Sequence, residues 1–319
     1  MWERSFREEK LEINLNEQLS QYSLLIVYAS MALLAVSFLL STLHLANTAA
    51  KPKEAEIAEG DVLVKTKTEQ TLMKNAGLWV MGVATLILGI GVTMRGLAAQ
   101  RVPWANMYEF AISSTLVILM IYLMSLYLKE VHFIAPLVSG FSLLSLGVAT
   151  SLFYVEVASL MPALQSFWLV LHVIVAVLAT SFFYIAAALH ITYLVRRASW
   201  AQGDSNAFQR VLSHFPSADT LDRFAYRFII VGFVLWSFTL IAGAIWAERA
   251  WNRYWGWDTK EVWTFIIWVV YAGYLHAKAT RGWTGKRAAY LGLVGFGAVL
   301  FNFTIVNLFF EGLHVYSGL

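Results

Sequence analysis

Long runs of apolar residues, separated by shorter polar segments, repeat along most of this 319-residue chain. Several of these runs exceed the roughly 18–20 residues that cross the hydrocarbon core of a bilayer as a helix. They predict eight helices, at residues 23–44, 77–97, 107–128, 134–154, 167–194, 227–247, 262–280 and 288–310. The largest polar segments, 45–76 and 195–226, are too short to form a second domain. The pattern therefore predicts an all-α polytopic membrane protein with about eight transmembrane helices.

The composition agrees with this interpretation and excludes several kinds of chemistry. The chain is 59% hydrophobic and 13% charged, whereas a soluble domain carries roughly a quarter charged residues. It has no cysteine, which excludes disulfides, thiol chemistry and a Cys-x-x-Cys-His haem-attachment motif of its own. Its basic residues lie in the loops between apolar runs rather than in a nucleic-acid-reading context, so a nucleic-acid partner is not expected.

Basic side chains orient the predicted bundle through the positive-inside rule. They gather after the fifth and the seventh predicted helices, as Arg196, Arg197, Arg210, Arg223 and Arg227, and as Lys278, Arg281, Lys286 and Arg287. Both segments are expected on the cytoplasmic side. The loop between the sixth and seventh helices and the tail at 311–319 are then expected outside, and the even number of helices places the N-terminus there too.

That external loop is unusually rich in tryptophan. Six of the thirteen tryptophans lie between residues 246 and 268. Four of them stand within thirteen residues, at Trp251, Trp255, Trp257 and Trp263. Membrane interfaces enrich tryptophan and tyrosine as single residues, which does not explain this density. Flat side chains in such number indicate a platform for a large planar ligand.

Two histidines are expected on the same side of the membrane as this loop. His172 lies about one turn into the fifth predicted helix, shortly after Trp168, and His314 follows the last helix. Neutral imidazole is a standard axial ligand of haem iron. Two imidazoles and an aromatic shelf on one surface predict a haem site with two histidine ligands.

A third histidine lies deep within a predicted span. His276 is some fifteen residues into the seventh helix, which is roughly 20 Å below the outer surface at ~1.5 Å per residue. An ionisable residue at such depth is a functional hypothesis. His190 and His44 fall near the inner ends of their helices, which allows a second haem site there. A hydrogen bond to a neighbouring helix, or a side chain that snorkels to the membrane interface, is the simpler interpretation, and the favoured one for His44, His132, His190 and His214.

The charged residues of the tryptophan-rich loop have structural interpretations beside a role in ligand binding. Asp258 and Glu261 stand three apart at the start of the seventh helix, where carboxylates cap free N–H groups and favour the positive end of the helix dipole. That structural role alone would account for them. Arg249 and Arg253 are either surface charges or bidentate partners of haem propionates.

Residues 255–261, WGWDTKE, resemble the WWD signature of haem-handling proteins in cytochrome c biogenesis. The chain is similar to the CcsA (ResC-like) type of system II rather than to the shorter exporter or the longer lyase of system I. The resemblance spans roughly 75–319 and includes NMYEF at 106–110, LQSFWLVLHV at 164–173, LDRFAYR at 221–227, GAIWA at 243–247, YLH at 274–276 and GLH at 312–314. Two departures affect the loop: Asn252 stands where the family pattern has glycine, and Thr259 where it has proline.

The resemblance implies a function that spacing alone does not show. Such proteins act with a CcsB- or ResB-type membrane subunit. They move haem b outward across the membrane and present it to the Cys-x-x-Cys-His motif of apocytochrome c, as components of a holocytochrome c synthase. His172 and His314 match the two external axial ligands. His276 matches a membrane histidine that ligates an inner haem, with its counterpart expected from the partner subunit.

Roles for the remaining candidates follow from the same resemblance. Catalysis is expected to consist mainly of haem positioning by the loop residues Trp251, Trp255, Trp257, Asp258 and Glu261. Haem contacts are expected from Trp168, Trp263, Arg249 and Arg253 as well. Residues 1–76 are expected to form an N-terminal segment with the first helix and a cytoplasmic loop, and 77–319 the haem-handling domain. A bacterial cytoplasmic membrane is the expected location.

Three alternatives remain open at this point. The first is a haem exporter that hands haem to a soluble chaperone. The second is a b-type electron-transfer subunit, whose paired histidines stand about thirteen or fourteen residues apart; His172 and His190 are eighteen apart. The third is a structural membrane subunit without a cofactor.

Overall fold

Helices account for nearly all of the residues that the structure describes. The computed structural model describes residues 2–49, 60–128, 131–158, 165–198, 207–213 and 215–314, and no strand occurs within these ranges. The helices are α1 (Trp2–Ala49), α2 (Gly60–Ala99), α3 (Met107–Leu128), a short 3-10 turn (His132–Ile134), α4 (Ala135–Leu152), α5 (Phe167–Arg196), α6 (Ala207–Ser213), α7 (Ala218–Trp251), α8 (Thr259–Arg281), α9 (Lys286–Phe303) and α10 (Ile305–Phe309).

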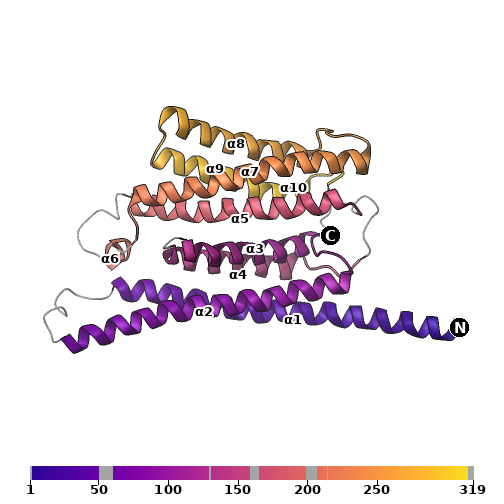
Figure 1. Cartoon of the computed structure of the whole chain (residues 1–319), viewed down its shortest axis with the longest axis horizontal. Coiled ribbons are helices and arrows are strands. Elements are labelled where there is room, and N and C mark those ends of the chain that lie inside the picture. Colours follow the sequence, from indigo (N-terminus) through magenta and orange to yellow (C-terminus); the bar gives the residue numbers. More distant parts are fainter. Residues whose placement is uncertain are drawn as a thin grey trace.

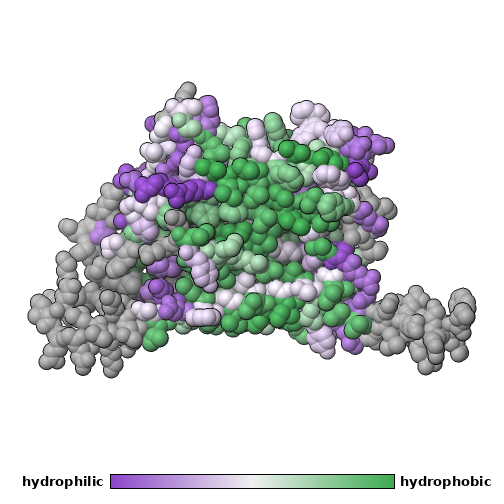
Figure 2. Space-filling model, in the orientation of Figure 1, coloured by the Kyte–Doolittle hydropathy of each residue, from purple (hydrophilic) through white to green (hydrophobic). Residues whose placement is uncertain are grey.

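The predicted class of an all-α, multi-pass membrane protein is confirmed. Each predicted run has a helical counterpart, and within the described residues seven helical segments are long and apolar enough to cross a membrane. α8 is helical but is not one of the seven, because tryptophan, tyrosine and lysine dilute its apolar stretch. An apolar band crosses the middle of the surface in Figure 2, and hydrophilic residues gather toward both ends of the helices.

Several predicted boundaries are wrong. α1 and α2 extend far beyond the apolar runs at 23–44 and 77–97, so much of 45–76 is helix; residues 50–59 lie outside the described part. The polar segment 195–226 contains α6 and the start of α7. The last predicted helix is interrupted at Thr304, which separates α9 from α10. Hydropathy detects only the apolar part of a helix, whereas backbone hydrogen bonding continues through polar turns.

α1 and α2 form an antiparallel pair along one side of the bundle (Figure 1). Their contact depends on a serine at every seventh position of α1. The hydroxyls of Ser23, Ser30 and Ser37 each donate a 2.8 Å hydrogen bond to a carbonyl of α2. A seven-residue repeat keeps these side chains on one helix face, and small residues allow close backbone approach in membrane helices.

α5 occupies the centre of the remaining bundle. It packs on α3, α7 and α9, while α8 lies at the far side against α7 and α9 (Figure 1). Aromatic stacking joins these layers: the rings of Phe183 on α5 and Tyr271 on α8 are 3.8 Å apart and nearly parallel. The start of α3, α5 and α8 and the end of α2, α7 and α10 meet at one end of the bundle, which we name the tryptophan end.

Candidate functional site

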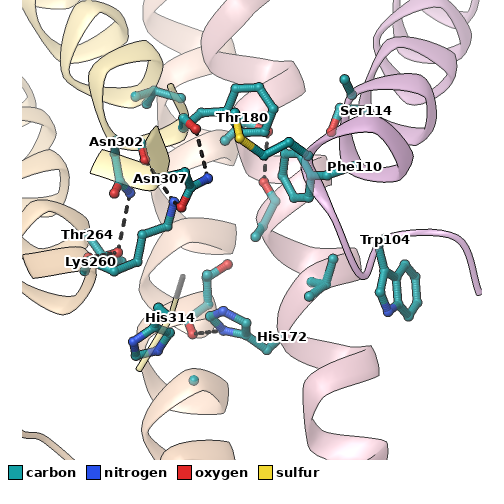
Figure 3. A pocket seen from close by; sticks show the side chains of 18 of the residues that line it. Trp104, Phe110, Ser114, His172, Thr180, Lys260, Thr264, Asn302, Asn307 and His314 are labelled. Carbon is teal, nitrogen blue, oxygen red and sulfur yellow. Dashed lines mark hydrogen bonds between the residues drawn. The ribbon is translucent and has the colours of Figure 1, made fainter. Parts of the chain in front are cut away.

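A cavity of about 400 Å³ opens inside the tryptophan end. Its wall comes from α3, α4, α5, α7, α8 and α9 and is mostly apolar, with a few polar side chains that converge on it (Figure 3). The main ones are His172, His314, Lys260, Asn302 and Asn307. Volume, apolar lining and a small set of polar groups are typical of a site for a small molecule or cofactor.

His172 enters the cavity from α5 as one defined tautomer of neutral imidazole. Ser166 caps the helix by accepting the N–H of Trp168, which sets the register of the first turns. The His172 Nδ1 lies 2.9 Å from the carbonyl oxygen of Thr239 on α7. A carbonyl only accepts, so Nδ1 carries the proton and Nε2 keeps its lone pair. This hydrogen bond therefore leaves Nε2 ready to ligate a metal.

The imidazole of His172 is also held by packing. A Cβ at Gly243 would lie only 2.7 Å from Cε1 of the ring, so the ring lies directly on the α7 backbone. Trp246 stacks near it, with ring centroids 6.1 Å apart and planes 22° apart. The orientation of the ring is fixed from two sides.

His314 reaches the same cavity from the tail after α10. Its ring meets the edges of two tryptophans, Trp246 with centroids 5.5 Å apart and Trp251 at 4.7 Å. Its side chain is 16% exposed, and burial lowers the pKa of His314 to about 4, although the Asp258 carboxylate acts in the opposite direction. His314 is therefore neutral at pH 7, as a ligating imidazole must be.

Asp258 connects the tryptophan-rich loop to this tail. It caps α8 by accepting the N–H of Lys260 at 2.9 Å through Oδ1, and Oδ2 accepts the N–H of Leu313 at 2.7 Å. Oδ1 also lies 3.4 Å from Nδ1 of His314. A Cβ at Gly312 would come within 2.5 Å of Oδ2, so the tail backbone approaches the carboxylate as closely as glycine permits. The helix cap and the histidine contact are thus roles of one carboxylate.

Glu261 completes the cap from the other side. Its Oε2 accepts the N–H of Gly256 at 2.8 Å and that of Asp258 at 3.1 Å, which makes a capping box with Asp258. Its Oε1 faces the guanidinium of Arg253 at 3.6 Å. The structural role considered for both acidic residues is present in the structure, and for Asp258 it is combined with a contact to His314.

The two departures noted in the loop sequence stand at positions that suit their residue types. Asn252 adopts a left-handed conformation, φ 57°, at the C-terminal cap of α7, where glycine is most common and asparagine is the usual substitute. Thr259 is the first residue of α8, where proline is favoured but not required. Trp257 also has a positive φ of 60°, a conformation that costs a bulky residue on the order of 1–3 kcal/mol.

The tryptophans predicted to form one platform lie in several different environments. Trp255 lines the cavity, and Trp251 contacts His314. Trp168 is partly buried in a small cluster with Leu169 and Trp246. Trp257 is 76% exposed and is not part of the cavity wall. Trp263 packs on Phe301, with centroids 4.2 Å apart, and does not line the cavity.

Neither predicted arginine lines the cavity. Arg249 is exposed, and Arg253 is engaged by Glu261 and lies over the Trp251 ring. The cation that does line it is Lys260, a residue not predicted to contribute to the site. One signal was present in the sequence: a lysine in the first turn of a helix opposes the helix dipole.

The other histidines lie apart from this cavity. His276 is exposed on α8. His190 is buried on α5, with Nε2 3.5 Å from the hydroxyl of Tyr274, in line with the simpler interpretation of a helix contact. His44 and His132 do not line the cavity, and His214 lies outside the described residues.

A buried ion-pair network, also not predicted, supports the wall of the tryptophan end. Arg95 of α2 and Glu109 of α3 are both fully buried and pair at 3.1 Å. Arg95 also donates to the Ser20 hydroxyl of α1 and to the carbonyl of Val155 after α4. The network therefore fastens four segments of the chain together beside the loop that leads into α3.

Comparison with known proteins links this architecture to one family. Residues 104–314 match the family model described as cytochrome C assembly protein. The chain is 34% identical over 272 residues to the cytochrome c biogenesis protein CcsA of Guillardia theta, covering 81% of this chain and 90% of that protein. It is 33% identical to CcsA of Synechococcus elongatus, covering 74% and 86%, and 33% identical to CcsA of Chlamydomonas reinhardtii, covering 75% and 67%.

Proposed function

The chain belongs to the cytochrome c assembly protein family, and we propose that it carries haem b across the membrane and presents it for attachment to apocytochrome c. Its relatives are named for cytochrome c biogenesis, which supports this assignment in outline. The proposal adds to that outline a ligand, haem b, and an outer site formed by His172 and His314.

One observation carries the outer site. His172 and His314, 142 residues apart in the sequence, line one apolar cavity, and the Thr239 carbonyl holds the Nδ1 proton of His172 so that Nε2 is free. Two neutral imidazoles are a complete axial ligand set for haem iron. The fit is in the chemistry of the donors: the histidines match the metal, and the apolar wall with Trp255 and Trp246 matches a porphyrin edge.

In this proposal the chain contributes binding, orientation and exclusion of water. When bound, haem supplies the vinyl groups that form thioethers with the two cysteines of the apocytochrome. His172, fixed by Thr239 and Gly243, is the permanent ligand. His314 lies on the tail that follows α10 rather than on a helix of the bundle, so we propose that it would be the ligand that gives way to the histidine of the incoming Cys-x-x-Cys-His motif. Positioning, rather than proton transfer, is then the main catalytic contribution of the loop.

We also propose an inner haem site that uses His276. Its imidazole is exposed on α8, a helix at the edge of the bundle that packs on α7 and α9 (Figure 1). This exposure favours a second ligand from a CcsB- or ResB-type membrane subunit over a local one. The tryptophan end would face outward and the basic segments around Arg196 and Lys286 inward, in a bacterial cytoplasmic membrane.

Optical spectra of the purified protein test the proposal. We expect a b-type spectrum in ferric and dithionite-reduced wild type, a changed spectrum in His172→Ala and His314→Ala, and less total haem in His276→Ala. A haem-free wild type, prepared with its partner and an adequate haem supply, would contradict the proposal. Co-purification with a soluble chaperone in place of an apocytochrome would favour the exporter, and quinone-dependent reduction of the haem would favour an electron-transfer subunit.

A further inference from the structure

Lys260 occupies a position that disfavours a cation. Asp258 is the N-terminal cap of α8, which makes Lys260 the second residue of the helix. The N-terminus of a helix carries the equivalent of about half a positive charge, so a lysine in this turn is repelled. Residues that break a local rule in this way tend to mark functional sites.

The ammonium of Lys260 is bound only by neutral groups. Nζ donates to the carbonyl of Asn302 at 2.8 Å and to Oδ1 of Asn307 at 2.9 Å (Figure 3). Among the described residues, no carboxylate forms an ion pair with Lys260. Asp258 and Glu261 are adjacent in sequence, but their oxygens accept backbone N–H groups or face Arg253 and His314.

A second lysine of the same helix provides the contrast. Lys278, three residues before the end of α8, has its ammonium 2.6 Å from the carboxylate of Asp222 on α7. Within the described residues the protein thus places a carboxylate in direct contact with one partly buried lysine of α8 and not with the other, on which Asp258 acts only at longer range. Since a charge removed from water is costly unless it is paired, Lys260 is prepared for an anion that the chain does not itself provide.

The cavity indicates where that anion comes from. Lys260, His172 and His314 line the same space together with Glu261, whose carboxylate is engaged by backbone N–H groups and faces Arg253, and the rest of the wall is mostly apolar. We propose that Lys260 binds a carboxylate of the ligand, a haem propionate, and thereby fixes the rotation of the ring about the axis through His172 and His314. This inference rests on the proposed function. Two axial ligands leave a ring free to turn about their common axis, and a third contact away from the axis is needed to direct the vinyl groups.

The test compares haem b with its dimethyl ester, which keeps the iron and the ring but has no propionate charge. Both are titrated by absorbance into the purified full-length chain in detergent, for wild type and Lys260→Met. We expect wild type to bind haem b about tenfold to a hundredfold more tightly than the ester, as for a charge-assisted hydrogen bond. In Lys260→Met the ratio of the two dissociation constants should fall close to one.

The ratio is measured within each variant, so a partial loss of folded protein does not affect it. Lys260→Arg should retain most of the preference, because it keeps the charge. Lys278→Met is the matched control, a neutralised lysine of the same helix away from the cavity, and should retain the preference fully. Arg249→Met and Arg253→Met examine the two arginines suggested by the sequence.

Each outcome has one meaning. If wild type binds neither compound, the proposed function fails. If wild type binds haem b through His172 but Lys260→Met keeps the preference for haem b over the ester, the function stands and the role of Lys260 is refuted. Loss of the preference in an arginine variant instead of Lys260→Met would assign the propionate to that arginine and also overturn the inference.

Discussion

His172 and His276 both lie on long helices of the bundle, but the protein surrounds them in opposite ways. His172 is enclosed: its Nδ1 bonds to Thr239, its ring lies on Gly243, and Trp246 stacks beside it. His276 is exposed on α8. A ligand site built within one chain fixes its imidazole in advance, whereas a site shared with another subunit leaves its imidazole at the surface. The comparison predicts two haem sites that respond differently to the same kind of mutation.

The largest expected effect is the loss of the enclosed histidine. In His172→Gly the proposed outer ligand is removed, and we expect the haem affinity of the outer site to fall by more than about 100-fold. Loss of a group that only orients a metal ligand costs about tenfold to a hundredfold, so the loss of the ligand itself should cost more. Added imidazole should restore part of the spectrum, because the mutation leaves a space lined by Gly243 and Trp246. The measurement is a haem titration with and without imidazole.

Trp255→Ala is the control for this rescue. Its indole lines the cavity but supplies no ligand nitrogen to iron, so imidazole should not restore haem binding. Recovery of the tryptophan variant by imidazole would refute the view that this side chain acts by positioning.

The next largest effect is expected at Asp258. Asp258→Asn preserves a good helix cap but removes the charge beside His314, so the stability of α8 should change little. Loss of a group that orients a metal ligand typically costs tenfold to a hundredfold, so haem affinity should fall by about that factor. Haem titration and the melting temperature of the haem-free protein distinguish the two roles. A large fall in melting temperature with unchanged affinity would show that Asp258 only caps the helix.

A smaller effect is expected at His276. In His276→Gly total haem per protein should decrease, while the reduction potential and spectrum of the outer haem stay as in wild type, because His276 does not line the outer cavity. Adding the partner subunit should raise the haem content of wild type but not of the variant. A shift in the outer reduction potential would mean that the two sites are coupled, contrary to the comparison.

The smallest effect concerns the pH dependence of the tail. Burial lowers the pKa of His314 from 6.5 to about 4 in the folded protein. Between these values the unfolded chain binds a proton that the folded chain does not, so stability should decrease as the pH falls from 6.5 to about 4 and be unaffected above 6.5. Melting temperatures of the haem-free protein across this range should show the decrease, and His314→Gln should remove that part of it. An unchanged slope in His314→Gln would place the titration elsewhere.

Much of the architecture was determined by the sequence alone. Apolar runs of membrane-spanning length give helices because a backbone in lipid must satisfy its own hydrogen bonds, so class and approximate spans were readable. The tryptophan-rich loop, His172 and His314 were singled out by residue type and by order along the chain. The lengths of α1 and α2 could not be predicted, since their polar turns carry no hydropathy signal.

Only the tertiary structure decided how these residues combine. It divided the tryptophans, so that Trp255 lines the cavity while Trp263 packs on Phe301. It placed Lys260, rather than an arginine, on the cavity wall, and gave Asp258 a contact to the tail as well as a cap. These outcomes depend on which helix faces meet and on which partner atom lies within about 3 Å. Hydrophobic patterns specify that a side chain is buried, but contacts between distant segments decide what it is buried against.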